Sequence, residues 1–449
     1  MTHPESGAHL ARALREFVGS ARFAQALTLL AVGFAFSTHA VRSVIGWPGL
    51  LAALASLLAL CGISLVARWR AVEWYGILPI TILVFVGWCV ASVLWSGPAG
   101  DAPGSTAVRA MYLVAFAFLG VYVALMRDTI QIVRAFGDVM RLLLSVSLAL
   151  EVFSGILLDL PIAFLGIQGD LGRFGPIQGI FGSRNLLGFV ALIALLTFII
   201  EWRTGIARRG RALGSTVLAA LCIVLAGSPT TWTALGASVV ALAALYSLRR
   251  AAPATRWQWQ IALLVAAVVA LVTAWILRLR IIELLDARAD FDVRLDVWRE
   301  LSRYLSHNPL QGWGWVGAWP DAPPYTWIEL ATGRNHASAL SAYVDVYFQV
   351  GVIGALLFIA LVGVALVRAW LLASSRRSVV YVWPALMLVV IAVTSFAESF
   401  ALVEGGWMLL VVCAVKAARD MSWRDALAAG RPPAPAVERI GDDSAKGER

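Results

Sequence analysis

The sequence predicts an all-helical protein that crosses a membrane many times. Of its 449 residues, 60% are apolar and only 14% are charged, and the mean hydropathy is +0.80. A soluble domain of this size cannot bury so much apolar surface. The apolar residues also gather into stretches of about 20, the length that crosses the hydrocarbon core of a bilayer. We therefore expect one helical bundle in a lipid bilayer rather than several soluble domains.

Twelve stretches have this length and character. They are residues 23–42, 47–67, 74–96, 107–126, 136–158, 185–202, 213–228, 231–248, 258–277, 347–372, 379–397 and 400–418. We expect a transmembrane bundle over 23–418. The tail 1–22 lacks a signal-peptide cleavage site, which favours a retained first span. The tail 419–449 contains a proline-rich and charged run that favours disorder.

Arginines divide the loops into two sets. Fourteen arginines lie in one set of short loops, whereas the alternate short loops carry only Arg42 and Arg109. Positive charge marks cytoplasmic loops, so both termini are predicted to be cytoplasmic. Two long loops, 158–184 and about 278–346, then face outward. The net charge of +9 is explained by these loops and does not indicate a nucleic-acid partner.

The cysteines give no sign of a metal or redox site. All four lie inside apolar stretches, and none has the CxxC spacing of a metal or redox motif. Buried thiols behave as small apolar groups. We therefore expect no disulfide, no metal site and no cofactor.

The first outer loop ends in a glycine-rich run that leads to Arg184 and Asn185. Asn185 stands at the start of an apolar helix, where we expect it to act as the N-cap. The positive end of the helix dipole, together with the charge of Arg184, would favour an anion. The alternative is that Arg184 only extends toward the membrane interface.

The second outer loop is the one long polar interval of the chain. Between Arg278 and Asp345 it carries seven arginines and nine carboxylates. An amphipathic helix is predicted from Val293 to Leu305, with Arg294 on its buried face. A buried arginine requires a carboxylate or a phosphate. Pairing with Asp290, Asp292 or Asp345 and binding of a phosphate both stay open.

Two further features of this loop carry chemistry. The turn Gly312-Trp-Gly-Trp places aromatic rings at the membrane interface or against a sugar. His336 follows Arg334 by two residues, and nearby positive charge lowers the pKa of an imidazole. A neutral imidazole accepts a proton, so His336 is a candidate general base. A hydrogen-bonding role at the interface is the alternative.

Three blocks, in this order, resemble the O-antigen ligase and polysaccharide polymerase superfamily of membrane glycosyltransferases. They are Gly179-Ile-Phe-Gly-Ser-Arg-Asn-Leu-Leu-Gly188; Arg294-Leu-Asp-Val-Trp298 with Asn308-Pro-Leu-Gln-Gly-Trp-Gly314; and Asn335-His-Ala-Ser-Ala-Leu340 with Gly351-Val-Ile-Gly-Ala-Leu356. The large outer loop before the last three predicted spans is also similar. The motifs cover about 170–360, and the topology covers the whole chain.

The resemblance implies transfer of a glycan from a polyprenyl diphosphate carrier to the hydroxyl of a glycan or glycolipid acceptor, without a metal and with inversion. It implies that His336 is the base, that Arg294 and Arg184 bind the diphosphate, and that Arg173 and Arg334 assist. Guanidinium groups suit this task because they bind phosphate oxygens in pairs. Many members carry a serine-arginine pair where this chain has Ser228-Pro-Thr-Thr231, which puts the full phosphate-binding set in doubt. The amide that commonly follows the histidine precedes it here.

Two other functions fit a chain of this kind. Twelve spans suit a transporter or a flippase of lipid-linked oligosaccharide. However, transporters place charged residues inside their spans, and here the spans are nearly free of charge. A scaffold for envelope assembly, without catalysis, is the third possibility. The motifs do not separate ligase from polymerase, because the two differ only in their acceptor.

Overall fold

The computed structural model of the chain describes residues 16–71, 79–96, 105–173, 175–252, 255–284 and 288–420. Across these ranges the structure is helical and contains no strand, apart from one isolated bridge between Ile162 and Ile167. The predicted all-α class is confirmed. Residues 1–15 and 421–449, most of the two predicted tails, lie outside the described residues.

Eight helices of the described ranges are long and apolar enough to cross a bilayer. They are α3 (Thr38–Ala67), α5 (Ser105–Met126), α6 (Thr129–Val152), α7 (Arg184–Arg203), α8 (Arg209–Ala226), α9 (Pro229–Arg250), α10 (Arg256–Ile276) and α14 (Ala342–Ser375). The protein is therefore a multi-pass membrane protein, as its composition predicted.

Shorter helices occupy the remaining predicted spans. They are α2 (Ala21–Phe36), α4 (Ile80–Ala91), α15 (Val382–Thr394) and α16 (Glu404–Asp420). These helices have between 12 and 17 residues. At 1.5 Å per residue they reach about 18–26 Å, less than the roughly 30 Å of a hydrocarbon core. The count of twelve spans therefore stays a prediction beside eight helices of sufficient length.

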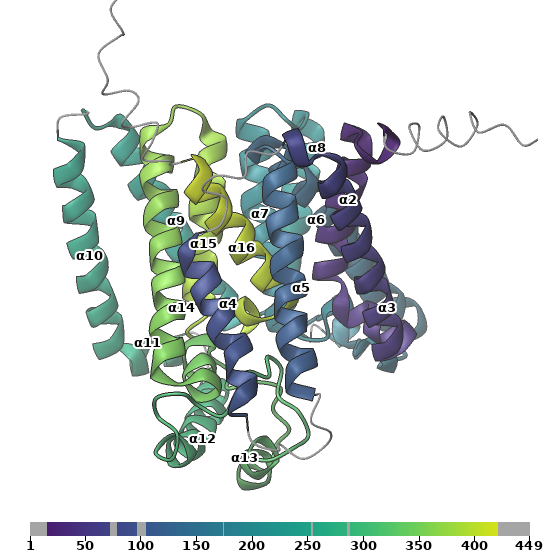
Figure 1. The fold of residues 1–449 in the computed structure, drawn as a ribbon, viewed down its shortest axis with the longest axis vertical. Coiled ribbons are helices and arrows are strands. Elements are labelled where there is room, and N and C mark those ends of the chain that lie inside the picture. Colours follow the sequence, from purple (N-terminus) through teal and green to yellow (C-terminus); the bar gives the residue numbers. More distant parts are fainter. Residues whose placement is uncertain are drawn as a thin grey trace, which may run out of the picture.

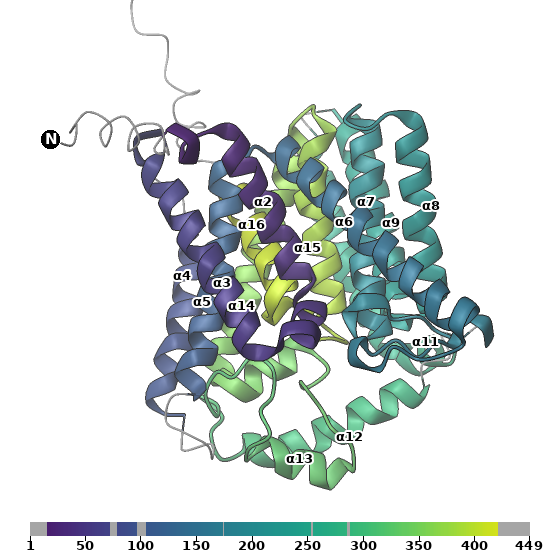
Figure 2. The ribbon, with the colours of Figure 1, turned by 90° about the vertical axis from the view of Figure 1, so that its right-hand side faces the viewer.

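The long helices run side by side, and three helices of the large polar loop gather at one end of the bundle (Figures 1 and 2). These are α11 (Arg278–Leu284), α12 (Arg288–Leu305) and α13 (Tyr325–Thr332). The centre of the bundle is formed by α7, α15 and α16, whose residues are mostly buried. Helix α10 lies at its edge.

The arginine-rich short loops lie at the opposite end of the bundle from α12 and α13. There Arg249, near the end of α9, donates to the backbone carbonyl of Arg376 at 2.8 Å. Lys416, near the end of α16, donates to the backbone carbonyl of Arg127 at 3.4 Å. The two classes of loop that the arginine count distinguished are thus at different ends of the fold.

The first predicted span, 23–42, extends too far. Helix α2 already ends at Phe36, and α3 begins at Thr38 after a single turn residue. Helix α3 is then interrupted at Gly46, where φ is +69° and ψ is −178°. Such a conformation is open to glycine and closed to other residues, and it produces a sharp bend at the same end of the bundle as α12.

Candidate functional site

Arg294 lies on the inner face of α12, and its side chain is 11% exposed. Its Nε and Nη2 donate to the backbone carbonyl of Ala397 at 3.2 and 3.1 Å. Nη2 also donates to Oε1 of Glu398 at 3.1 Å, and that carboxylate is 9% exposed. A buried charge is costly unless it is paired, so this contact fixes α12 to the turn between α15 and α16.

The rest of α12 confirms the predicted phase of the helix. Arg299 and Arg303 lie on its exposed face and pair with Asp296 and Glu300 at 2.9 and 3.1 Å. Leu301 faces inward and is fully buried. The helix begins five residues earlier than the predicted Val293. Its inner face is therefore the one that carries Arg294.

Asn185 connects this pair to the beginning of α7. Its Nδ2 donates to Oε1 of Glu398 at 2.6 Å, and its Oδ1 accepts a hydrogen bond from Oγ of Ser228 at 2.7 Å. The prediction that Asn185 is the N-cap is wrong. Ser183 has the extended backbone that an N-cap requires, and its Oγ accepts from the N–H of Leu186 at 3.1 Å.

Ser228 begins α9 and completes the network. Its side chain accepts a hydrogen bond from the N–H of Thr231 at 3.3 Å and so caps that helix. The starts of α7 and α9 are in close contact, because a Cβ on Gly188 would collide with the hydroxyl of Thr231. Four elements therefore meet through the chain Arg294–Glu398–Asn185–Ser228, which we call the Arg294 network.

A break in α14 anchors the loop that follows α12. The helix is non-helical at Val350 and Gly351, and Gly351 has φ +70° and ψ −173°. The carbonyls of the two residues before Val350 accept from the N–H groups of Trp313 and Gly314 at 3.2 and 2.7 Å. The carbonyl of Val350 accepts from Nε1 of Trp88 at 2.9 Å. The N–H groups of this turn and of the Trp88 ring thus satisfy the backbone carbonyls that lose their helical partners at the break.

Side chains of α14 also bind the loop around this turn. Oε1 of Gln349 accepts from the N–H groups of residues 316 and 317 at 2.9 Å each. Oδ1 of the fully buried Asp345 accepts from Nε1 of Trp319 and from Nε2 of Gln349, both at 2.9 Å. Trp315 is 1% exposed, so for this ring the prediction of an interfacial or sugar-stacking position is wrong. The turn is packed against α14 and holds the loop to that helix.

His336 lies in the turn that follows α13 and is 7% exposed. Its Nε2 lies 3.0 Å from Oγ1 of Thr332, and its backbone N–H donates to Oε1 of Glu329 at 3.0 Å. Burial lowers the pKa of its imidazole, Glu329 opposes this shift, and Arg334 adds to it. The predicted direction of the pKa shift is confirmed, but burial is a larger cause than the arginine.

The His336 turn is attached to α12 one helical turn beyond Arg294. Nε1 of Trp298 donates to the carbonyl of Ala339 at 2.8 Å. Within the part of the chain that the structure describes, His336 makes no hydrogen bond or ion pair with Arg294. The two side chains belong to the same end of the bundle and are linked through Trp298 rather than directly.

The other predicted arginines lie on either side of this region. Arg184 is the first residue of α7, is partly buried, and precedes Asn185 of the Arg294 network. Arg173 ends a short turn in the first long loop and is exposed. Arg334 is exposed beside His336. The structure therefore places Arg184 next to the network and the other two on the surface.

Glu398 is the site residue that the sequence reasoning missed. Of the three proposed partners of Arg294, Asp292 is exposed and Asp345 is engaged by Trp319. The side chain of Asp290 lies outside the described residues. A signal was present, because Glu398 lies in the two-residue interval, 398–399, between the last two predicted spans. A lone acid in such an interval is a candidate partner for a buried base.

These features define a class of protein: a multi-pass helical membrane protein whose long polar loop carries a buried arginine that binds the turn between the last two helices at one end of the bundle. Residues 214–359 match the model of a family described as O-antigen ligase. The matched segment runs from α8 into α14 and includes Arg294 and His336. A search of curated proteins gave no match.

Proposed function

We propose that this protein is a glycosyltransferase that moves a glycan from a polyprenyl diphosphate carrier to an acceptor hydroxyl at the outer face of the cytoplasmic membrane. The match of residues 214–359 to the O-antigen ligase family supports ligase or polymerase activity in the membrane. The single observation that carries the finer proposal is the buried Arg294 in its network with Glu398 and Asn185. The acceptor is a glycan or a glycolipid.

We propose twelve spans, with both termini in the cytoplasm. In this orientation the arginine-rich short loops face the cytoplasm, as the positive-inside rule requires. The Arg294 network and His336 then face outward. Helices α15 and α16 lie at the centre of the bundle, where protein rather than lipid surrounds them, so they need not match the thickness of the bilayer. Around α2 and α4 the bilayer thins, which is one response to a short span.

The donor diphosphate binds between Arg294 and Arg184. Arg294 is held in place by Ala397 and Glu398, and its planar guanidinium matches the oxygens of a phosphate group. Arg184 stands at the positive end of α7, where an anion is favoured. Arg173 and Arg334 are exposed on the flanking loops, from which they attract the anionic donor.

His336 acts as the general base. The hydroxyl of Thr332 has one proton, and it donates this proton to the carbonyl of Ile328 at 2.9 Å. The same hydroxyl then accepts from Nε2–H of His336 at 3.0 Å. This arrangement favours the tautomer in which Nδ1 carries the lone pair. The lowered pKa keeps the imidazole neutral at pH 7.

The reaction is a single displacement. The acceptor oxygen forms a bond to the anomeric carbon while the bond from that carbon to the phosphate oxygen breaks. The hydroxyl proton passes to Nδ1 of His336, and polyprenyl diphosphate leaves with the electron pair. Arginine charges stabilise the diphosphate, which supplies the electrostatic role that a divalent cation has in many transferases. One displacement inverts the anomeric centre.

The test is turnover by the purified protein in lipid nanodiscs. The protein is incubated with a polyprenyl diphosphate-linked glycan, with and without a candidate acceptor, and free polyprenyl diphosphate and the glycan product are measured. We expect the two products to appear in equal amounts and only with an acceptor. EDTA should leave the rate unchanged.

The same assay is repeated with the variant His336→Ala. This variant should still bind the donor and should lose transfer. Movement of intact donor across the bilayer without release of polyprenyl diphosphate would identify a flippase instead. Transfer by His336→Ala at the wild-type rate would refute the role of the base while leaving the transferase in place.

A further inference from the structure

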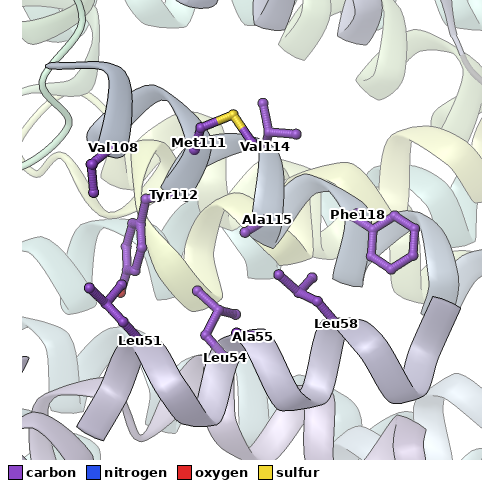
Figure 3. A pocket seen from close by; sticks show the side chains of 10 residues that line it. All are labelled: Leu51, Leu54, Ala55, Leu58, Val108, Met111, Tyr112, Val114, Ala115 and Phe118. Carbon is purple, nitrogen blue, oxygen red and sulfur yellow. The ribbon is translucent and has the colours of Figure 1, made fainter. Parts of the chain in front are cut away.

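An apolar groove of about 420 Å³ runs between α3 and α5. One wall is made by α3 residues such as Leu51, Leu54 and Leu58, and α5 supplies the other wall (Figure 3). Tyr112 stands at one end of the groove near Leu51, and Phe118 stands toward the other end near Leu58. Leu51 is 39% exposed, so the groove is open on the side of the bundle that meets lipid.

The end at Tyr112 is the polar end. The ring of Trp47 lies edge-on to that of Tyr112, with centroids 6.2 Å apart, and the guanidinium of Arg42 lies 4.9 Å from the centroid of Trp47. The hydroxyl of Tyr112 donates to Glu404 at 2.9 Å. Arg42 precedes the bend at Gly46, at the end of the bundle where the Arg294 network lies. A cation therefore stands beyond one end of an otherwise apolar groove.

This end of the groove leads toward the Arg294 network. Glu404 lines a second, small cavity between α2, the start of α7 and the start of α16. The same cavity is lined by Leu186 and Phe400. Leu186 follows Asn185 directly, and Phe400 lies two residues after Glu398. The contact of Tyr112 with Glu404 thus joins the groove to a cavity that is lined by sequence neighbours of the network residues.

We infer that the groove between α3 and α5 binds the polyprenyl tail of the donor. The inference rests on the proposed function and adds the place of the lipid chain. The apolar lining suits a branched hydrocarbon, and the lateral opening admits it from the bilayer. The tail enters between Leu51 and Leu58, and its anionic head lies toward Arg42 and the network. The remainder of a long chain stays in the bilayer.

The test narrows the groove and compares donors with long and short tails. Ala55 lines the groove, whereas Ala52 lies on α3 outside it and is exposed. Ala55→Phe should raise KM for a long-chain donor roughly tenfold, because it displaces a few methylene groups of the tail. It should leave kcat unchanged, and it should not affect a donor with a two-isoprene tail. Ala52→Phe should change neither value.

A photo-crosslinking measurement identifies the occupant. Wild-type protein is placed in vesicles of phosphatidylglycerol and phosphatidylethanolamine with a diazirine either in the donor tail or in the phosphatidylglycerol acyl chain. We expect only the tail probe to label the α5 wall of the groove. Equal KM values for Ala55→Phe and Ala52→Phe, or labelling by the acyl probe alone, would overturn the inference. Absence of turnover with both donors would refute the proposed function separately.

Discussion

Replacement of Arg294 by lysine separates charge from geometry at the centre of the proposed site. The guanidinium makes two hydrogen bonds to Ala397 and one to Glu398. A lysine keeps the positive charge and reaches Glu398 or Ala397, but it cannot form the planar fork. Each lost bond from a charged donor costs about 1.5–3 kcal/mol, so a lysine that keeps one of the three bonds should lower stability by about 3–6 kcal/mol. The loss of paired phosphate contacts should lower transfer about a hundredfold.

The control is Arg299→Lys on the same helix. Arg299 is 68% exposed and pairs only with Asp296 on the surface, so its replacement should change neither stability nor transfer measurably. Stability is measured by chemical unfolding in mixed micelles, and transfer by release of polyprenyl diphosphate in nanodiscs. A wild-type transfer rate for Arg294→Lys, with or without a change in stability, would show that this arginine only holds α12 in place.

Three further predictions concern neighbouring parts of the site. Glu398→Gln removes the negative charge that pairs with the buried Arg294 at 3.1 Å and should lower stability by about 3 kcal/mol, as measured by chemical unfolding. Gly351→Ala should cost about 3 kcal/mol or more in the same assay, because its φ of +70° is closed to alanine and a Cβ would collide with a backbone carbonyl of the facing loop. The transfer rate should fall on acidification with a midpoint below pH 6.5, because His336 with its lowered pKa becomes protonated there.

Each of these three has a matched comparison. Asp296→Asn breaks an exposed pair on α12 and should cost less than about 0.5 kcal/mol. Gly363→Ala, in the same helix as Gly351, meets no atom within 4 Å and should stabilise by about 1 kcal/mol. Glu329→Gln removes the charge that raises the pKa of His336, so the acid limb should move to lower pH. Equal changes in stability for Glu398→Gln and Asp296→Asn, or for Gly351→Ala and Gly363→Ala, would contradict the reasoning. An acid limb with its midpoint above pH 6.5 would contradict the role of His336.

Periodicity predicted the parts of the site that depend on one element. The spacing of apolar residues placed Arg294 on the inner face of its helix and Arg299 and Arg303 outside, and the contacts of α12 confirm both. Composition predicted the membrane helices for the same reason, because burial in lipid is a property of each stretch by itself. The spacing of apolar residues along one helix thus predicts which face of that helix a side chain occupies.

Contacts between distant elements were beyond the sequence. The intervals 308–314 and 351–356 both belong to blocks that carry the family resemblance. Nothing in either sequence indicates that the two intervals contact each other. Their relation follows from the break at Gly351, which exposes carbonyls that the Gly312–Gly314 turn satisfies. Glu398 was missed for the same reason, since its importance depends on α12 folding back over the turn before α16.

The Arg294 network also explains how the proposed diphosphate site can be stable when no substrate is bound. A lone buried guanidinium would destabilise the fold, and Glu398 removes that cost by supplying a counter-charge. The same carboxylate receives Asn185, so the start of α7, with Arg184, is held beside Arg294 before any anion arrives. An anion that enters this space meets arginines already in place and need not order them, which lowers the entropic cost of binding. Ser228, at the turn where the family resemblance leads us to expect an arginine, contributes a hydroxyl to the same network. At this position the chain therefore supports the arginines of other elements instead of adding one.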